Sequence, residues 1–391
     1  MKDLNLQTKN VKSLKSRAFY RPYGVGFLIL LVAVLVLHLA LPDKAYSSTE
    51  KRSLTQAPEL SASSLVSGSF MSSAEDYMAD QFPGRDLLMS VKADVTYFLG
   101  ERESQGVYYG SHDMLIERFD EPDAGLLKTT TEAVKAFAEE HTDMTAYFMI
   151  VPTQVEIMAE YLPSYAPNGD MAAYISDFYD GLGKLVTPIE VTKALNKAKD
   201  AGTKVYYASD HHWTTDGAYA AYERAADVMG LTVGTYKKGV VSNTFVGSLA
   251  SKSGYSLPTA DTVTVYLPEE EEHLYVTMAD GTVKSSLYDM DALTGDNAYE
   301  VFLGGNYPSF TITTAADTEK SLLVFKDSYA NCFLPFLTGN YKTITVIDPR
   351  YYSDDLETYL SSHSFDDVLF LYNASTLSQD TSLAQVLTGW E

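Results

Sequence analysis

The chain of 391 residues contains one cysteine, and only 29 lysines and arginines against 52 aspartates and glutamates. A single cysteine, Cys332, excludes intramolecular disulfides, so a folded domain of this size depends on its apolar core. Cys332 is either a reactive thiol or a small buried apolar residue, and its place in an expected helix favours the second. The shortage of basic residues gives a formal net charge of −23 and disfavours nucleic-acid binding, which normally needs a basic surface.

Long hydrophobic runs are also scarce, and the one that stands out extends from Gly24 to Leu41. Its length suits a helix that spans the hydrocarbon of a bilayer. Basic residues gather before the run, which places the N-terminus in the cytoplasm and the rest of the chain outside. We therefore expect a basic cytoplasmic tail over 1–23, a transmembrane signal anchor over 24–42 and a single-pass protein of the cell membrane with an extracytoplasmic C-terminal domain. A cleavable signal peptide is the alternative, although the basic and apolar regions are long for one.

The outer part of the chain has the pattern of an α/β protein. A polar linker over 43–60 precedes an alternation of helical periodicity with short apolar strands from residue 61 to 391, which predicts a parallel sheet flanked by helices. Residues 231–318 break the alternation and predict a β-rich insertion, with Glu269 to Glu272 in a solvated loop. The elements expected are helices over 73–97 (broken at Pro83-Gly84), 124–141, 174–201 (interrupted near Pro188), 214–229, 329–337 and 354–361, a hairpin over 106–117, and strands over 146–151, 204–208, 321–325, 343–347 and 367–371.

Residues suited to acyl-transfer chemistry follow two of these strands. Asp210 and His212 come after the strand over 204–208, and Ser328 comes after the strand over 321–325. Catalytic groups in open α/β sheets cluster at the carboxyl ends of strands. A serine hydroxyl is a poor nucleophile that needs a positioned base, and the base needs a carboxylate to hold its tautomer. Because Asp210 and His212 point to one side of an extended segment, the pair suits that arrangement.

Further residues are candidates for oxyanion or substrate binding. At the start of a helix, the amides of Ser328 and Tyr329 are natural oxyanion donors, aided by the helix dipole. Asn373 follows the last strand and either adds a side-chain donor or is an ordinary loop asparagine. Trp213 is either a core aromatic or a substrate platform, and Arg350 either lines the cleft or forms a structural ion pair.

A metal site at Asp210, His211 and His212 is the alternative to acyl-transfer chemistry. Carboxylates and imidazoles are common metal ligands. No third, separated motif of His, Cys or carboxylate with ligand spacing accompanies these residues in the sequence. We therefore expect no metal and no cofactor.

Two motifs resemble a known family. Residues 210–219 (Asp-His-His-Trp-Thr-Thr-Asp-Gly-Ala-Tyr) and 326–331 (Lys-Asp-Ser-Tyr-Ala-Asn) are similar to the DHHW family of bacterial membrane-anchored proteins, which is related to the SGNH-hydrolase-like alginate O-acetyltransferases AlgJ and AlgX. The likeness covers nearly the whole outer region, through the motif at 81–86 (Gln-Phe-Pro-Gly-Arg-Asp) to Asn373. It implies an SGNH-hydrolase-like fold with a permuted order of its triad.

By this resemblance Ser328 is the nucleophile, His212 the general base and acid, and Asp210 the orienting carboxylate. Lys326 stands where many SGNH enzymes have glycine, and a bulky side chain there can narrow the approach to Ser328. The expected activity is O-acetylation of a polysaccharide or glycan acceptor through an acyl-Ser328 intermediate, with a membrane-bound O-acyltransferase as the partner that delivers the acetyl group. The alternatives are a carbohydrate esterase and a non-catalytic envelope protein that binds glycan or acts as a scaffold.

Overall fold

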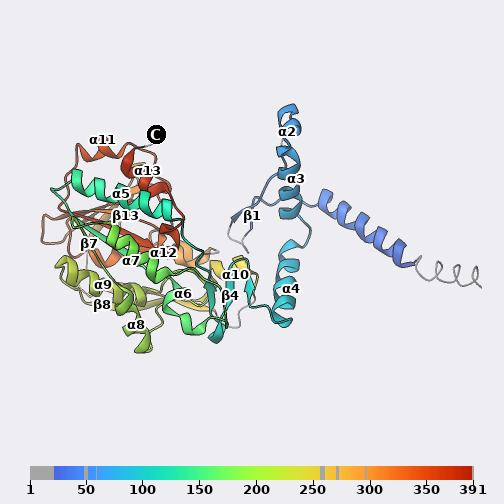
Figure 1. Cartoon of the computed structure of the whole chain (residues 1–391), viewed down its shortest axis with the longest axis horizontal. Coiled ribbons are helices and arrows are strands. Elements are labelled where there is room, and N and C mark those ends of the chain that lie inside the picture. The colour runs from blue at the N-terminus through green and yellow to red at the C-terminus, as the bar shows by residue number, and fades with distance from the viewer. Residues whose placement is uncertain are drawn as a thin grey trace, which may run out of the picture. The chain divides into compact units, whose positions relative to one another are not determined.

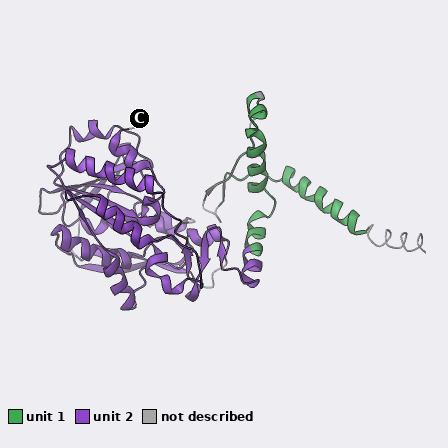
Figure 2. Ribbon diagram, viewed as in Figure 1, with its two compact units in different colours: residues 1–92 green, residues 93–391 purple. Residues whose placement is uncertain are grey.

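The computed structural model of the chain describes residues 22–47, 52–58, 60–255, 260–269, 273–295 and 297–389. It divides into two compact units, Met1–Lys92 and Ala93–Glu391 (Figure 2). The domain boundaries expected from the sequence stay predictions. The tail over 1–23 falls almost entirely outside the described residues, as does the acidic cluster after Glu269.

The first unit is largely helical. Its first helix, Pro22–Ala40, has a mean hydropathy of 2.5 and is long and apolar enough to cross a membrane, which no other described helix is. The segment predicted as a linker contains a short antiparallel pair, β1 and β2, and Pro83-Gly84 separates two helices as predicted. The bounds are β1 (Tyr46–Ser47), β2 (Arg52–Ser53), α2 (Ala62–Ser67), α3 (Ser69–Asp80) and α4 (Arg85–Phe98), which continues into the second unit.

The second unit is built on a sheet whose described strands have the order β11-β10-β12-β14-β13-β15-β6-β7. From β14 to β7 neighbouring strands are parallel, and β12, β10 and β11 extend the sheet antiparallel. The central parallel strands consist almost wholly of buried residues, as expected where helices cover both faces of a sheet. The bounds are β6 (Thr145–Val151), β7 (Val186–Pro188), β10 (Leu274–Met278), β11 (Val283–Lys284), β12 (Ser309–Thr314), β13 (Ser321–Lys326), β14 (Thr343–Ile347) and β15 (Asp367–Asn373).

A ladder of stacked rings runs across the middle of this sheet. Phe370 on β15 lies opposite Phe148 on β6 and Phe325 on β13, with ring centroids 5.3 and 5.1 Å apart. Cross-strand aromatic pairs of this kind each stabilise a sheet by roughly 0.2–1 kcal/mol. The ladder holds β13 in register, and Ser328 lies in the turn that follows the last residue of β13, Lys326.

Helices flank the sheet in Figure 1. Side-chain caps start two of the predicted helices: Thr214 Oγ1 accepts the Gly217 N–H at 3.1 Å at the start of α9, and Asp123 caps α5. The bounds are α5 (Ala124–Glu140), α6 (Gln154–Ile157), α7 (Met171–Gly181), α8 (Thr192–Asp200), α9 (Thr215–Met229), α10 (Ser248–Ser253), α11 (Leu356–Leu360), α12 (Ala374–Leu377) and α13 (Ser382–Thr388), with 3₁₀ turns η1 (Ser111–Asp113), η2 (Ala159–Tyr161), η3 (Met290–Thr294), η4 (Ala298–Val301), η5 (Ser328–Cys332) and η6 (Leu334–Leu337).

The predicted α/β architecture is confirmed, but the sheet is mixed and not wholly parallel. Residues 231–318 do not form a separate β-rich body, because they supply β10, β11 and β12 to the main sheet. Only part of the segment stands apart, as the ribbon of β8 and β9. Local alternation of apolar residues identifies a strand but cannot say which sheet it joins. The remaining bounds are β3 (Glu103–Ser104), β4 (Val107–Tyr109) and β5 (Leu115–Glu117), which include the predicted hairpin, and β8 (Tyr236–Phe245) and β9 (Asp261–Pro268).

Two predicted elements are wrong. Residues 204–208 form no strand, because their backbone groups bond to the turn that follows: the Thr214 N–H donates to the Val205 carbonyl at 2.9 Å. The predicted helix over 329–337 is instead the pair of 3₁₀ turns η5 and η6. Pro335 has no N–H to donate to a carbonyl four residues earlier, so an α-helix cannot continue through it.

Candidate active site

The two segments that the sequence singles out meet at the carboxyl end of β13. His212 Nε2 lies 2.8 Å from Ser328 Oγ, and His212 Nδ1 lies 2.6 Å from Asp210 Oδ1. Asp210 and His212 are both buried, so little water competes for these bonds. The two distances give a continuous hydrogen-bonded path from a carboxylate through an imidazole to a hydroxyl, which is the geometry that a nucleophile with an oriented base needs.

A tight loop presents Asp210 and His212 to the serine. Within it, Asp210 Oδ1 also accepts the backbone N–H of His212 at 3.0 Å, and the Tyr207 N–H donates to the His212 carbonyl at 3.3 Å. Gln154 at the start of α6 donates its amide protons to the carbonyls of Tyr207 and Asp210 at 2.9 and 2.6 Å. Gln154, which the sequence analysis missed, thus fixes both sides of the loop.

Residues of the 231–318 segment hold the carboxylate from the other side. Asp210 Oδ2 accepts the Ser248 N–H at 2.7 Å, and Ser209 Oγ accepts the Gly247 N–H at 2.9 Å. A Cβ added to Gly247 would lie 2.1 Å from the Cβ of Asp210, so no side chain fits there. Asp261, at the start of β9, accepts the Ser209 N–H at 2.8 Å. The segment predicted as an insertion therefore forms one wall of the site.

The surroundings of Asp210 and His212 separate their pKa values. Burial by itself would raise the pKa of Asp210, but the imidazoles of His211 and His212 and the hydrogen bonds from His212 and the Ser248 amide hold it well below its usual range. Burial and the nearby His211 lower the pKa of His212 to about 4, against the opposing effect of Asp210. At neutral pH the site therefore holds an ionised carboxylate and a neutral imidazole, which is the protonation state of a general base.

Tyr299, on η4, is a functional-site residue that the sequence analysis missed. Its ring stacks on the His212 imidazole with centroids 3.8 Å apart and planes 13° apart. Its hydroxyl donates to the backbone carbonyl of Ser328 at 3.0 Å, and its oxygen lies 3.4 Å from Cys332 Sγ. One buried side chain thus touches both His212 and Ser328. Nothing in its local sequence distinguishes it among 29 tyrosines.

The turn that carries Ser328 differs from the expected helix N-terminus. Asp327 Oδ1 accepts the Tyr329 N–H at 2.8 Å, so that amide is already engaged and is not a free oxyanion donor here. Asn373 Nδ2 donates to Asp327 Oδ2 at 2.6 Å and to Thr376 Oγ1 at 2.8 Å, which uses both of its protons. The 3₁₀ turn η5 has five residues, too few for the helix dipole on which the expectation relied.

Trp213 is structural in this arrangement, whereas Arg350 forms an ion pair and stays partly exposed. Trp213 is fully buried and donates its Nε1–H to the Tyr329 carbonyl at 2.9 Å, so it is a core aromatic and not an open substrate platform. Arg350 donates from Nε and Nη2 to the two carboxylate oxygens of Asp348 at 2.8 and 2.7 Å. Its side chain keeps an exposed fraction of 24%, so part of it still meets solvent.

Lys326 turns into the protein and does not line an approach to Ser328. Its side chain is fully buried, with Nζ 3.2 Å from Asp348 Oδ2 and hydrogen bonds of 2.8 and 3.0 Å to Asn331 and Asn306. Burial lowers the pKa of Lys326, and the Asp348 carboxylate opposes this shift. The narrowing that the sequence suggested is therefore absent, because the amine is drawn to a buried carboxylate.

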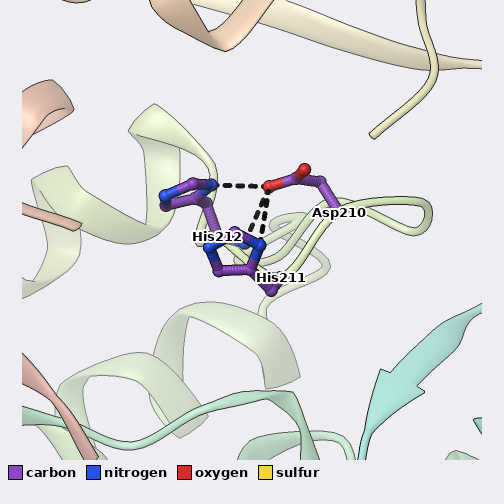
Figure 3. A group of neighbouring side chains, drawn as sticks. All are labelled: Asp210, His211 and His212. Carbon is purple, nitrogen blue, oxygen red and sulfur yellow. Dashed lines mark hydrogen bonds and ion pairs between the residues drawn. The ribbon is translucent and has the colours of Figure 1, made fainter. Parts of the chain in front are cut away.

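Asp210, His211 and His212 offer ligand atoms within 4.8 Å of one another (Figure 3), as a metal site would. Both ring nitrogens of His212 are already in hydrogen bonds, to Asp210 and to Ser328, and His211 Nδ1 lies 2.6 Å from Ser248 Oγ. An ion would have to displace one of these partners. The arrangement suits a proton relay better than a metal.

Comparison with known proteins finds a matching family model and a relative that the chain matches in part. Residues 109–311, just over half of the chain, match the family model of the SGNH hydrolase-like domain of the acetyltransferase AlgX. The chain is 25% identical over 175 residues to the probable alginate O-acetylase AlgJ of Pseudomonas fluorescens. That match covers 41% of this chain and 43% of AlgJ, so it spans less than half of the relative's length.

Solved structures show the same fold. A DHHW family protein from Eubacterium siraeum superposes with a TM-score of 0.62 at 22% identity, over 73% of this chain and 96% of that one. Bacillus cereus PatB1 superposes with a TM-score of 0.60 at 22% identity, over 71% of this chain and 98% of its own. With the family model matched over just over half of its length, the chain belongs to the family of SGNH hydrolase-like domains typified by the acetyltransferase AlgX.

Proposed function

We propose that this chain is an O-acetyltransferase that works through an acetyl-Ser328 intermediate. The observation that carries the proposal is the path from Asp210 through His212 to Ser328 Oγ, with hydrogen bonds of 2.6 and 2.8 Å. Membership of the AlgX family and the partial likeness to AlgJ support acetyl as the group transferred.

In the first half-reaction, Ser328 Oγ attacks the carbonyl carbon of an acetyl ester while its proton moves to His212 Nε2. The Asp210 carboxylate stabilises the imidazolium that forms and keeps Nδ1 protonated. The tetrahedral intermediate then collapses, and the leaving alkoxide takes the proton from Nε2. Acetyl-Ser328 and the deacylated donor are the products.

In the second half-reaction, an acceptor hydroxyl gives its proton to His212 Nε2 and attacks the acetyl-Ser328 carbonyl. Collapse of this second intermediate releases the acetylated acceptor and returns the proton to Ser328. The Ser328 amide is the proposed oxyanion donor, and the partly exposed side chain of Arg350 is the proposed contact for a polar or anionic substrate group. Because the likeness includes a probable alginate O-acetylase, the proposed acceptor is a polysaccharide or glycan of the cell envelope.

The proposed location follows from the helix Pro22–Ala40, which is apolar and long enough to be a single-pass anchor. With the basic tail in the cytoplasm, the catalytic unit would lie outside the cell. Acetyl donors made inside would then reach Ser328 through a membrane-bound O-acyltransferase as partner. A carbohydrate esterase differs only in using water as the acceptor, and a non-catalytic glycan-binding protein would have no need of the bonded Asp210, His212 and Ser328.

The test uses the full chain in detergent with 4-nitrophenyl acetate. We expect a burst of nitrophenol and one added acetyl group, located on Ser328 by peptide mass spectrometry. Ser328→Ala should show neither, and equal release by the wild type and this variant would refute the proposal. Addition of oligoalginate or peptidoglycan fragments then separates a transferase, which acetylates them, from an esterase, which releases only acetate.

A further inference from the structure

One face of α4 is apolar and exposed. Its side chains recur at the spacing of helical turns and therefore share one side of the helix. Each has an exposed fraction between 48% and 88%, although large apolar side chains are usually buried. These residues, called the α4 apolar face below, are Leu87, Leu88, Val91, Val95 and Phe98, together with Leu99 directly after the helix.

The opposite side of α4 is already in contact with protein. Ala93 is buried, and the ring of Tyr97 packs against Tyr109 and Tyr255 with centroids 4.6 and 6.2 Å apart. The α4 apolar face is therefore not a core side that has lost its contacts. A contiguous exposed patch of six large apolar side chains marks a surface that another body covers.

The beginning of α4 is close to the outer end of the helix Pro22–Ala40. Near that end, the His38 ring lies 5.6 Å from the Tyr77 ring of α3, and His38 Nδ1 lies 3.3 Å from the Gln81 carbonyl. The Lys44 N–H, just beyond the helix, donates to Gln81 Oε1 at 2.9 Å. Gln81 is the C-terminal cap of α3, and six residues of extended chain reach at most roughly 20 Å, so Leu87 lies within that distance of Gln81.

We propose that the α4 apolar face lies in the outer interface of the bilayer that the helix Pro22–Ala40 crosses, so that its occupant is lipid. This inference rests on the anchoring proposed above. Leucine, valine and phenylalanine on one side of a helix are what shallow insertion at the boundary of headgroups and acyl chains requires. A helix held at this depth would shorten the tether between the membrane and the unit that carries Ser328, where a membrane partner would deliver the acetyl group.

Charge at the edges of the face indicates how it would bind. Lys92 lies at one edge and Asp94 at the other, and Arg85, which precedes the face, is paired with Asp80 and Asp86. The described residues around the face therefore form no basic belt. Attraction to anionic headgroups therefore contributes little, and burial of apolar area supplies the affinity. The contact should be equally strong on zwitterionic and anionic membranes and insensitive to salt.

The test exploits the single native cysteine, which is fully buried and should take no label. Val91→Cys and Phe98→Cys place an environment-sensitive nitrobenzoxadiazole dye on the face, and Lys128→Cys places it on an exposed position of α5 as the control. Each full chain is reconstituted into vesicles of phosphatidylcholine, alone or mixed with phosphatidylglycerol, at low and high salt. Nitroxide-bearing lipids should quench positions 91 and 98 several-fold more than position 128, and aqueous iodide should quench position 128 more.

Three outcomes overturn the inference. If iodide quenches the dyes at 91 and 98 as strongly as the dye at 128, the face lies in water. Dyes shielded from iodide but not quenched by nitroxide lipid would assign the face to a protein, either a second copy or a membrane partner. Quenching that appears only with anionic lipid, or is lost in salt, would contradict binding by apolar burial.

Vesicle flotation separates this inference from the proposed function. If the chain floats with the vesicles but the dye at position 91 is quenched only by iodide, the interfacial helix is refuted and the membrane anchor stands. If the chain does not float, both the interfacial helix and the membrane anchor are refuted. Turnover of 4-nitrophenyl acetate by the same samples reports on Ser328 independently of either result.

Discussion

Around Ser328 charged side chains are fully buried, whereas on α4 large apolar side chains are exposed. Lys326, Asp327 and Asp348 each have an exposed fraction of 0%. Transfer free energies favour neither arrangement, since buried charges and exposed apolar surface both cost stability. The two regions differ in how that cost is offset: one by interactions within the chain, the other by contact with another body.

At the end of β13 every charge is offset within the chain. Asp348 accepts from Lys326 and from Arg350, and Asp327 accepts two backbone N–H groups and one amide. Nothing in the described part of the chain covers the α4 apolar face, so the cost of its exposure is not offset there. The first region is therefore complete without a partner, and the second is complete only when another body covers it.

The largest expected effect is on catalysis. Ser328→Ala and Asp210→Asn should each lower the turnover of an acetyl ester by about 10³-fold or more, because one removes the nucleophile and the other the orientation of the base. Initial rates with 4-nitrophenyl acetate measure this loss. Ser362→Ala, at an exposed serine, is the matched control and should keep the wild-type rate. Retained turnover in Asp210→Asn would show that the Asp210 carboxylate takes no part in the reaction.

The buried charges should be the most sensitive to the loss of their shared partner. Asp348→Asn removes the carboxylate that Lys326 and Arg350 share, leaves only Asp327 to balance them, and should cost about 3–5 kcal/mol of the free energy of unfolding. Lys326→Met leaves Asp348 paired with Arg350 and should cost less, about 1–3 kcal/mol. Denaturation by urea measures both. Lys320→Met, at a half-exposed lysine directly before β13, should change stability by only about 0.5 kcal/mol.

A larger loss in Lys326→Met than in Asp348→Asn would reverse this ranking. It would mean that the lysine acts through its packing and its bonds to Asn306 and Asn331, and not through Asp348.

Tyr299 should act on kcat through its two contacts. Tyr299→Phe keeps the ring stacked on His212 but loses the bond to the Ser328 carbonyl, and should lower kcat about tenfold. Tyr299→Leu loses both contacts and should lower kcat about 10²-fold with little change in KM. Steady-state kinetics on the acetyl ester distinguish the two variants. Equal losses would show that the stack contributes nothing.

The pH dependence of activity should follow the lowered pKa of His212. Because burial and His211 lower that pKa to about 4, the neutral base persists at pH 5–6 and kcat/KM should fall only as the pH drops through about 4. Between an unfolded value near 6.5 and about 4, the unfolded chain binds the proton first, so stability also falls as the pH drops. A pH–rate profile measures this acid limb, the pH range over which kcat/KM falls.

The matched variant is His211→Gln, which removes the neighbouring group that lowers the pKa of His212. The acid limb should move upward, toward pH 6.5, while the rate on the alkaline plateau changes little. An unmoved limb would assign the whole shift to burial.

The smallest expected effect is on α4. Val91→Ser should leave the free energy of unfolding within about 0.5 kcal/mol and ester turnover unchanged, because its side chain is exposed in the free chain. Denaturation in detergent-free buffer is unsuitable for a chain with an apolar anchor, so urea titration in mild detergent is the measurement. A loss comparable to that of a core truncation would show that the face is buried within the chain.

Much of the site was accessible from the sequence because strand ends are local signals. The apolar run before Ser328 correctly predicts the strand β13 there, whereas the strand expected before Asp210 does not form. The tertiary fold brings His212 Nε2 to 2.8 Å from Ser328 Oγ. The same argument gives β14 its bounds without error. These features depend on residues adjacent in the chain.

The rest depended on contacts that no local pattern encodes. Tyr299 and Ser248 reach the site from the segment predicted as a separate β-rich insertion, and only the tertiary fold shows that β12 joins the main sheet. The role expected of the Tyr329 amide overlooked a local rule. An aspartate before a helical turn caps it, so Asp327 claims that N–H.

Gly247 has a consequence for how variants of this protein can be sampled. Even the methyl group of alanine would coincide with the side chain of Asp210. In a saturation library, position 247 should therefore tolerate no replacement, although it lies outside both motifs by which the family is recognised. A profile of tolerated codons would mark this glycine as strongly as the nucleophile, and would show that the 231–318 segment cannot be trimmed from a minimal catalyst.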